Sequence, residues 1–279
     1  MNKFIAAFDG LKFSESTRDY AIATAKEQKA HLTGVFLDDK TYTSYKIYDL
    51  VLEQGVSEQK LKEYREDDNL LRQNAAENFE HDCIQSSIVY NIHHDKNVAL
   101  HELLHESIFS DLLIINREES FTHHDEKYPS RFIRDLLSDT QCPVLLVPPK
   151  YKEIQKIILL FDGHTTSVYA IKMFNYLFAQ FKKLPIEVLS IKSVEENLHL
   201  PENKLMKEFL KRHYTNVTYT VLKGIPENEI INYLNAEKLN FMCVLGAYRR
   251  TMVSRWFKSS MADALVNAFK SPLFIAHNK

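Results

Sequence analysis

The chain has 279 residues, 45% of them hydrophobic, a length that suits two domains of ordinary size. Its formal net charge of −2 gives no overall indication of binding to nucleic acid or to a membrane surface. No apolar stretch is long enough to span a bilayer, and Asp9 interrupts the first apolar run too early for a signal peptide. Cys83, Cys142 and Cys243 form no CxxC pair, which indicates a reduced, cytoplasmic protein.

Charge is distributed unevenly along the chain. Residues 1–150 hold 17 Lys and Arg against 26 Asp and Glu, a net charge of −9. Residues 151–279 hold 18 against 11, a net charge of +7. An anionic ligand is therefore expected to prefer the second half. Mutual docking of two oppositely charged halves explains the same asymmetry.

The sequence also repeats itself. Ile5–Gly10 reads IAAFDG, and Ile158–Gly163 reads ILLFDG. Both halves end on a Pro-led apolar strand, CPVLLVPP at Cys142–Pro149 and SPLFIAHN at Ser271–Asn278. Two copies of one domain are the simplest explanation. We place the boundary between residues 149 and 150, because prolines and charged residues interrupt the apolar pattern there.

Strand and helix patterns alternate within each copy. In the first copy, apolar runs predict strands at 4–8, 32–37, 87–92, 112–115 and 144–147. Helical spacing predicts helices near 14–25, 57–83, 98–109 and 130–138, whereas residues 41–52 fit neither pattern. The second copy repeats this order, with strands near 156–161, 186–191, 217–222, 241–245 and 273–276. This alternation predicts an α/β fold with a doubly wound, five-stranded parallel sheet in each half.

The order of these motifs resembles that of the universal stress protein family, with two such domains in one chain. In that family each domain opens with a strand that ends in Asp-Gly or Asp-Ser, matched here by Asp9-Gly10 and Asp162-Gly163. Each domain closes with a strand that follows Cys-Pro or Ser-Pro, matched at Cys142-Pro143 and Ser271-Pro272. The resemblance implies two three-layer α/β sandwiches of the adenine nucleotide alpha hydrolase-like type. It also implies an intrachain pseudo-dimer, with a homodimer as the alternative, in which the closing strands 144–147 and 273–276 make contact.

The family's ATP-binding branch carries Gly-x-x-Gly, nine residues, then Gly-Ser or Gly-Thr before the closing strand. The second half matches this pattern only in part, with Gly246 and Ser260 in register but Arg249 and Ser259 in the positions of the other two glycines. Arg249 and its neighbour Arg250 offer phosphate-binding side chains where the family uses bare backbone. A long side chain at a position of close approach fills the site equally well. ATP or ADP in the second half is therefore one hypothesis, and an empty loop is the other.

The matching loop of the first half begins at Asn116 and contains no glycine. Glu118 and Glu119 follow where phosphates would lie, so we expect this half to bind no ATP without a metal ion.

The aspartates at the two strand ends have two interpretations. The resemblance implies that Asp9 and Asp162 face a nucleoside, whereas an Asp before a helix often caps it or holds the turn. We favour the structural role for Asp9 and leave both roles open for Asp162.

A further motif, His101-Glu102-Leu103-Leu104-His105, matches HExxH. On a helix this spacing places two imidazoles on one face for zinc, with a glutamate as base. The neighbouring leucines already give the helix an apolar core face, so we expect His101 and His105 to be partly exposed and without a metal. A zinc-dependent hydrolase remains the remote alternative.

The resemblance implies a universal stress protein that acts in the stress response by binding or regulation, without turnover. No Ser–His–Asp arrangement, CxxC pair or intact P-loop in the sequence supports an enzyme. The alternative is a nucleotide-binding switch whose second domain holds ATP or ADP through Asp162, Gly246, Arg249, Arg250, Ser259 and Ser260. The expected partner is another protein, with neither nucleic acid nor membrane.

Overall fold

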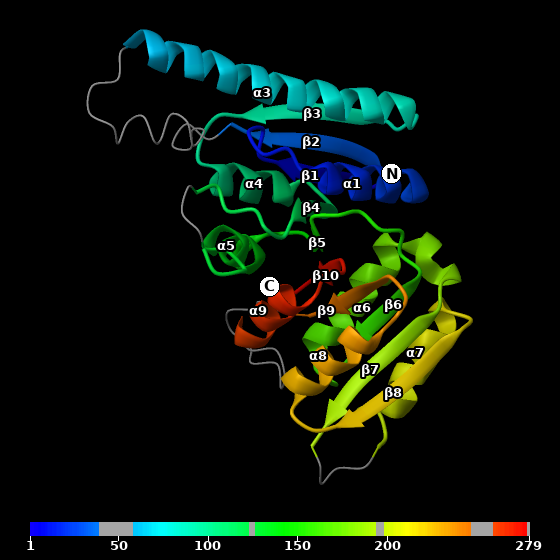
Figure 1. The fold of residues 1–279 in the computed structure, drawn as a ribbon. Helices are drawn as coiled ribbons and strands as arrows, with labels where there is room; N and C mark the ends of the chain where they lie inside the picture. The colour runs from blue at the N-terminus through cyan, green and yellow to red at the C-terminus, as the bar shows by residue number, and fades with distance from the viewer. Residues whose placement is uncertain (39–57, 123–125, 194–197, 247–258, 278–279) are drawn as a thin grey trace. The chain divides into compact units, whose positions relative to one another are not determined.

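The computed structural model describes residues 1–38, 58–122, 126–193, 198–246 and 259–277 (Figure 1). The chain divides into two compact units, Met1–Gln141 and Cys142–Lys279. Within the described residues, no helix combines the length and apolar character needed to cross a membrane. The ambiguous segment 41–52 lies outside the described residues.

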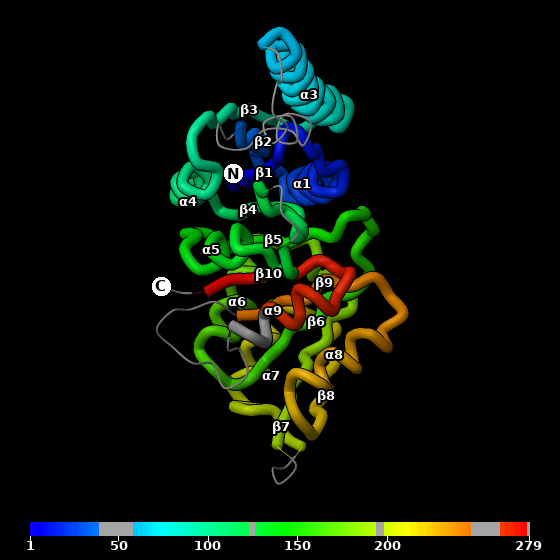
Figure 2. The backbone as a smooth tube through the Cα atoms, turned by 60° about the vertical axis from the view of Figure 1, so that its left-hand side comes forward, coloured from blue at the N-terminus to red at the C-terminus, as the bar shows by residue number. Residues whose placement is uncertain are grey.

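The first unit is an α/β layer structure with strand order β3-β2-β1-β4, and the pairs β2–β3, β1–β2 and β1–β4 are parallel. In Figure 2, α1 and α3 cover one face of this sheet and α4 and α5 cover the other. The elements are β1 (Lys3–Phe8), α1 (Glu15–Gln28), β2 (His31–Leu37), α3 (Glu58–Gln85), β3 (Tyr90–Asp95), α4 (Ala99–Ile108), β4 (Leu112–Asn116) and α5 (Arg131–Asp139).

The second unit has the strand order β5-β10-β9-β6-β7-β8, again with helices on both faces (Figure 2). Helices α6 and α7 cover one face, and α8 and α9 cover the other. The elements are β5 (Val144–Val147), β6 (Lys156–Leu160), α6 (Thr165–Leu177), the 3-10 helix η1 (Ala179–Lys183), β7 (Ile186–Lys192), α7 (Asn203–His213), β8 (Val217–Lys223), α8 (Pro226–Ala236), β9 (Phe241–Leu245), α9 (Ser259–Ala268) and β10 (Leu273–Ile275).

Local sequence explains most of these elements. The central strands are continuous apolar runs because both of their faces are covered by helices, and residues 4–8 and 157–160 are fully buried. Ser14 caps α1 by accepting a hydrogen bond from the Thr17 N–H at 3.2 Å. Ser130 caps α5 by accepting from the Ile133 N–H at the same distance. The doubly wound α/β fold predicted from the sequence is confirmed.

Two details differ from the expected pattern. The third strand begins at Tyr90 rather than near residue 87, because Ser87 has a φ of 55° in the turn after α3. The strand β5 closes the first sequence repeat but belongs to the second compact unit. It pairs antiparallel with β10, with Leu145 opposite Phe274. The expected contact between the two closing strands is therefore confirmed. Among the described residues, each half of the sequence holds five strands, as expected, and the division into compact units assigns four of the ten to the first unit and six to the second.

Candidate functional site

In the second unit the candidate site lies at the carboxyl ends of two neighbouring strands. β6 and β9 are parallel and paired, with Leu159 opposite Val244. Asp162 follows β6 and Gly246 follows β9, so the two residues lie at the same edge of the sheet. In open α/β sheets this edge is where ligands usually bind. The fold thus brings together two of the six site residues expected from the sequence.

Asp162 is 3% exposed and holds the turn between β6 and α6. Its Oδ1 accepts a hydrogen bond from the His164 N–H at 2.9 Å and another from the Ser167 hydroxyl at 2.7 Å. The Ser167 hydroxyl also contacts the His164 carbonyl oxygen at 2.9 Å. Asp162 therefore ties the start of α6 to the end of β6, which is the structural role considered for it from the sequence.

Gly246 packs against the first turn of α6. A β carbon built on Gly246 would lie 2.3 Å from the Thr166 carbonyl oxygen and 2.8 Å from the Ser167 nitrogen. The absence of a side chain therefore permits close approach of a helix backbone. This contact explains the glycine without a ligand, although a glycine in such a loop also suits phosphate binding.

The structure says less about the other four residues expected at this site. Arg249 and Arg250 lie outside the described residues. Ser259 and Ser260 begin α9, close to where the sequence predicts a helix start. Thr166, in the first turn of α6, is 2% exposed, and its buried hydroxyl has no hydrogen-bond partner among the described residues. A buried hydroxyl without a described partner, on the residue whose backbone contacts Gly246, favours a polar ligand at this place.

In the first unit the corresponding edge contains two buried carboxyl groups. Asp9 follows β1 and is 1% exposed, and its Oδ1 accepts from the Leu11 N–H at 2.8 Å. Glu119 follows β4, the neighbour of β1, and is 8% exposed. Burial, together with the nearby carboxylate of Asp9, raises the pKa of Glu119 to about 8. Glu118, by contrast, is exposed, so only Glu119 of the two expected carboxylates is buried at this edge.

Aromatic side chains occupy the ends of β1 and β2 in the same unit. Phe8 stacks on Phe13 and on Phe36, with both ring centroids 5.1 Å away. Phe79 of α3 completes this aromatic cluster at 5.3 Å from Phe8. The aromatic side chains at the ends of β1 and β2 therefore pack against one another and against α3.

Arg117 is the first residue after β4, and its side chain is buried. The residue is 8% exposed, and its Nη1 has no hydrogen-bond partner in the part of the chain that the structure describes. Burial lowers the pKa of this guanidinium, whereas Glu118 and Tyr128 act in the opposite direction. A buried cation with no described ion pair is unusual because its lost hydration is only partly replaced. The sequence places Arg117 directly after Asn116 in this loop but gives no sign that it is buried.

The two histidines of the HExxH motif lie on α4 and are both exposed. The ring of His105 contacts that of Phe109 at 5.6 Å. Across the part of the chain that the structure describes, no three His, Cys, Asp or Glu side chains form a metal-binding group. The expected exposure of His101 and His105 is thus confirmed.

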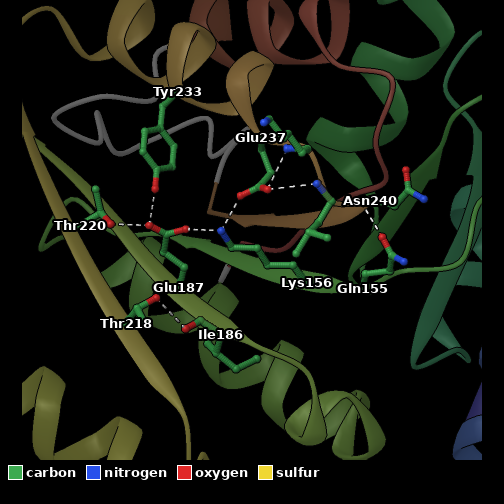
Figure 3. Close-up of polar contacts among 11 residues, drawn as sticks. Gln155, Lys156, Ile186, Glu187, Thr218, Thr220, Tyr233, Glu237 and Asn240 are labelled. Carbon is green, nitrogen blue, oxygen red and sulfur yellow. Dashed lines mark hydrogen bonds and ion pairs between the residues drawn. The ribbon is translucent and has the colours of Figure 1, made fainter.

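Sequence analysis missed a buried charge cluster at the opposite, amino-terminal end of the second sheet (Figure 3). Lys156 of β6 pairs with Glu187 of β7 at 2.7 Å and with Glu237 at 2.5 Å. Glu187 also accepts hydrogen bonds from Thr220 and from the Tyr233 hydroxyl. These contacts lower the pKa of Glu187 against the opposing effect of burial. The sign of this cluster in the sequence was Lys156, a charged residue at the start of an otherwise apolar strand.

Comparison with solved structures defines the class of fold. The structure matches a universal stress protein from Archaeoglobus fulgidus DSM 4304 with a TM-score of 0.71 and 10% identity, covering 100% of this chain and 99% of that chain. It matches a putative universal stress protein from Pseudomonas aeruginosa UCBPP-PA14 with a TM-score of 0.63 and 11% identity, covering 99% and 92%. The chain therefore has the fold of the tandem universal stress proteins.

A third match is to the cytoplasmic domain of a prokaryotic cation chloride cotransporter, with a TM-score of 0.51, 12% identity and coverage of 99% of this chain and 95% of that chain. No protein-family model matches the sequence, and no curated protein matches it. The likeness is thus one of fold, carried by the same arrangement of strands and helices at low sequence identity.

Proposed function

We propose that this protein is a cytoplasmic stress-response module of the universal stress protein type, which acts by binding a partner protein and not by turnover. The observation that supports the universal stress protein type most directly is the shared role of Asp9 and Asp162. Each aspartate holds the backbone N–H two residues further on, Leu11 at 2.8 Å and His164 at 2.9 Å. The same carboxylate position thus stabilises a turn in both units.

The fold comparisons support the universal stress protein type. Two of the matched proteins are named as universal stress proteins, and a third is a cytoplasmic domain of a transporter. Proteins with one fold often differ in function, so the argument depends on the sites. In the first unit, the buried carboxyl group of Glu119 lies at the edge of the sheet where the family binds nucleotide, and we take it to disfavour phosphates there.

The second candidate function is a nucleotide-binding switch in the second unit. It is favoured by the buried hydroxyl of Thr166, which has no partner among the described residues, and by the net charge of +7 in residues 151–279. In this proposal the phosphates of ATP or ADP lie along residues 246–250 and the start of α9, with Asp162 towards the ribose or base. Arg249 and Arg250 each supply charge-assisted hydrogen bonds worth about 1.5–3 kcal/mol.

Titration calorimetry of the full chain with ATP, ADP and magnesium, together with a phosphate-release assay, tests both candidates. The switch requires heat of binding that is greatly reduced in Arg249→Glu and nearly unchanged in Asp9→Ala. If Asp9→Ala abolishes binding and Arg249→Glu does not, the assignment to the second unit is reversed. If millimolar ATP gives no heat, the switch fails and the binding module stands, whereas sustained phosphate release would show an enzyme.

A further inference from the structure

Helix α4 covers one face of the first sheet and carries exposed apolar side chains on its outer side (Figure 2). Val98, directly before the helix, is 45% exposed, and Ile108 and Phe109 at its end are 57% and 64% exposed. Val98 is also the N-cap residue, a position that favours a polar side chain, and its side chain makes no cap hydrogen bond. Such a departure from local preference is expected where another molecule covers the helix.

The two histidines of the HExxH motif lie on the same side of α4. We call this side the α4 stripe, which consists of Val98, His101, His105, Ile108 and Phe109. Its first four members are separated by three, four and three residues, and such intervals place side chains on one face of a helix. The opposite face, towards the sheet, consists of the buried residues Ala99, Leu103 and Ser107. Two exposed imidazoles are therefore flanked by exposed apolar side chains at both ends of the helix.

The carboxylates next to these histidines are engaged within the chain. The amide of Asn97 donates a hydrogen bond to Glu102 at 2.6 Å. Glu106 contacts the His93 Nδ1 at 2.6 Å and the Lys3 Nζ at 3.4 Å. Glu102, the expected base of a zinc hydrolase, is thus bonded to a neighbouring amide. The imidazoles of the α4 stripe are the groups on this surface that suit a metal ion without hydrolysis.

The α4 stripe is complementary to a second copy of itself. Positions 98 and 108 have the same midpoint, 103, as positions 101 and 105. When two α4 helices lie antiparallel around a twofold axis at this midpoint, His101 of each chain meets His105 of its partner. In the same arrangement Val98 of each chain meets Ile108 of its partner. A twofold interface requires this property, because every contact in it occurs twice.

We propose that two copies of this chain bind one zinc ion between their α4 helices, with His101 and His105 of each copy as the four ligands. Zinc binds imidazole nitrogen and prefers four ligands in a tetrahedral arrangement. A single chain supplies only two ligands here, in agreement with the absence of a three-ligand group among its described residues. The site is therefore incomplete without the second copy. This self-association goes beyond the binding of a partner protein or a nucleotide proposed above.

The zinc ion, and not apolar contact, should control the association. Stable interfaces usually involve about 20–30 residues on each side, far more than the α4 stripe offers. Residues 1–150 also carry a net charge of −9, so the first halves of two copies repel each other. A divalent cation between the helices offsets this repulsion. We therefore expect a monomer without metal and a dimer with zinc.

The test measures the mass of the full chain by light scattering after gel filtration, first without metal and then with zinc chloride. The wild type should become a dimer that holds one zinc ion per two chains. His101→Ala and His105→Ala each remove two of the four ligands, because both copies carry the change. Loss of a residue that only supports a ligand costs about 10–100-fold in metal affinity, so each variant should dimerise with zinc at least tenfold more weakly.

The matched control is His81→Ala, which removes an exposed imidazole from α3 and should respond to zinc as the wild type does. Melting temperatures without metal should be equal in all four proteins, since the three histidines are exposed, and they check that the variants fold. Equal zinc-dependent dimerisation in the wild type and both α4 variants would overturn the proposal. One zinc ion per chain with no change in mass would also overturn it, as would a wild type that binds no zinc.

A double-mutant cycle tests the antiparallel arrangement. Val98→Lys and Ile108→Glu should each weaken the zinc dimer, because each places a charge opposite an apolar side chain of the partner. In the double variant the introduced lysine of one copy faces the introduced glutamate of the other. Its dimer should be at least about twofold tighter than the two single losses together predict. The two positions are about 15 Å apart along one helix, so this gain must arise between chains. Losses that simply add would overturn the antiparallel arrangement.

Discussion

The space beside Gly246 is occupied by the backbone of Thr166, whose carbonyl oxygen would lie 2.3 Å from a β carbon at Gly246. This contact packs the first turn of α6 against the end of β9. The one glycine that survives from the family's nucleotide loop is thus also required by the packing of the sheet and helix. Its presence alone does not distinguish a ligand site from a structural contact.

Gly246→Ala should therefore destabilise the protein without any nucleotide. We expect a loss of about 1–3 kcal/mol in the free energy of unfolding, because the backbone of α6 must move away. The matched control is Gly10→Ala, whose β carbon would meet the Arg72 Cγ at 2.8 Å. A flexible side chain can move more easily, so the control should lose less. Denaturant unfolding measures both, and an equal or smaller loss in Gly246→Ala would contradict the packing role.

The hydrogen bonds of Asp162 give a second prediction. Asp162→Ala removes the acceptor for the His164 N–H and the Ser167 hydroxyl and should cost about 2–4 kcal/mol in ligand-free protein. Ser167→Ala alone should cost less, because one of the two hydrogen bonds remains. In a double-mutant cycle the two changes should be non-additive, since they share a bond of 2.7 Å. Additive losses would show that the two side chains stabilise the protein independently.

The raised pKa of Glu119 predicts that the stability of the protein depends on pH. Its folded pKa of about 8 lies above the ordinary value of 4.5, so between these pH values the folded protein binds a proton that the unfolded chain has released. Stability should accordingly fall as pH rises through this window, by at most about 1.4 kcal/mol per pH unit from this group. Glu119→Gln should remove that part of the slope, as measured by unfolding at pH 5 to 8. An identical slope in the variant would refute the role of Glu119.

Lys156 is expected to be essential for the stability of the second unit. Lys156→Met leaves Glu187 buried at 3% exposure without its cation and should cost about 3–5 kcal/mol. The double variant Lys156→Met/Glu187→Gln should recover part of this loss because the buried charge is also removed. Lys183→Met, at an exposed position, should change stability by less than about 0.5 kcal/mol. A double variant no more stable than Lys156→Met would argue against charge burial as the cause.

The predicted domain boundary is tested by two fragments. A fragment of residues 142–279 keeps β5, which pairs with β10 in the second unit. A fragment of residues 150–279 exposes the edge of β10, and an unprotected strand edge favours aggregation. We expect the longer fragment to be the more stable and the less prone to aggregate, by thermal unfolding and light scattering. Equal behaviour would favour the boundary between 149 and 150 that the sequence suggests.

The sequence by itself determined the repeat, the alternation of strands and helices, and the positions of Asp9 and Asp162 at strand ends. These features are local, since unbroken apolar runs and helical spacing report directly on burial by neighbouring layers. It also predicted the contact of the closing strands at 144–147 and 273–276, because such strands leave unpaired edges, and the structure shows it between Val144–Val147 and Leu273–Ile275.

Only the tertiary structure decided what these residues contact. Arg117 and Glu118 are adjacent charged residues, yet one is buried and the other exposed. The contact of Gly246 with Thr166 joins residues 80 positions apart, and the ion pair of Lys156 with Glu187 joins two strands. Burial and pairing of this kind depend on how helices pack on the sheet, and no periodicity in the chain encodes which individual side chains meet.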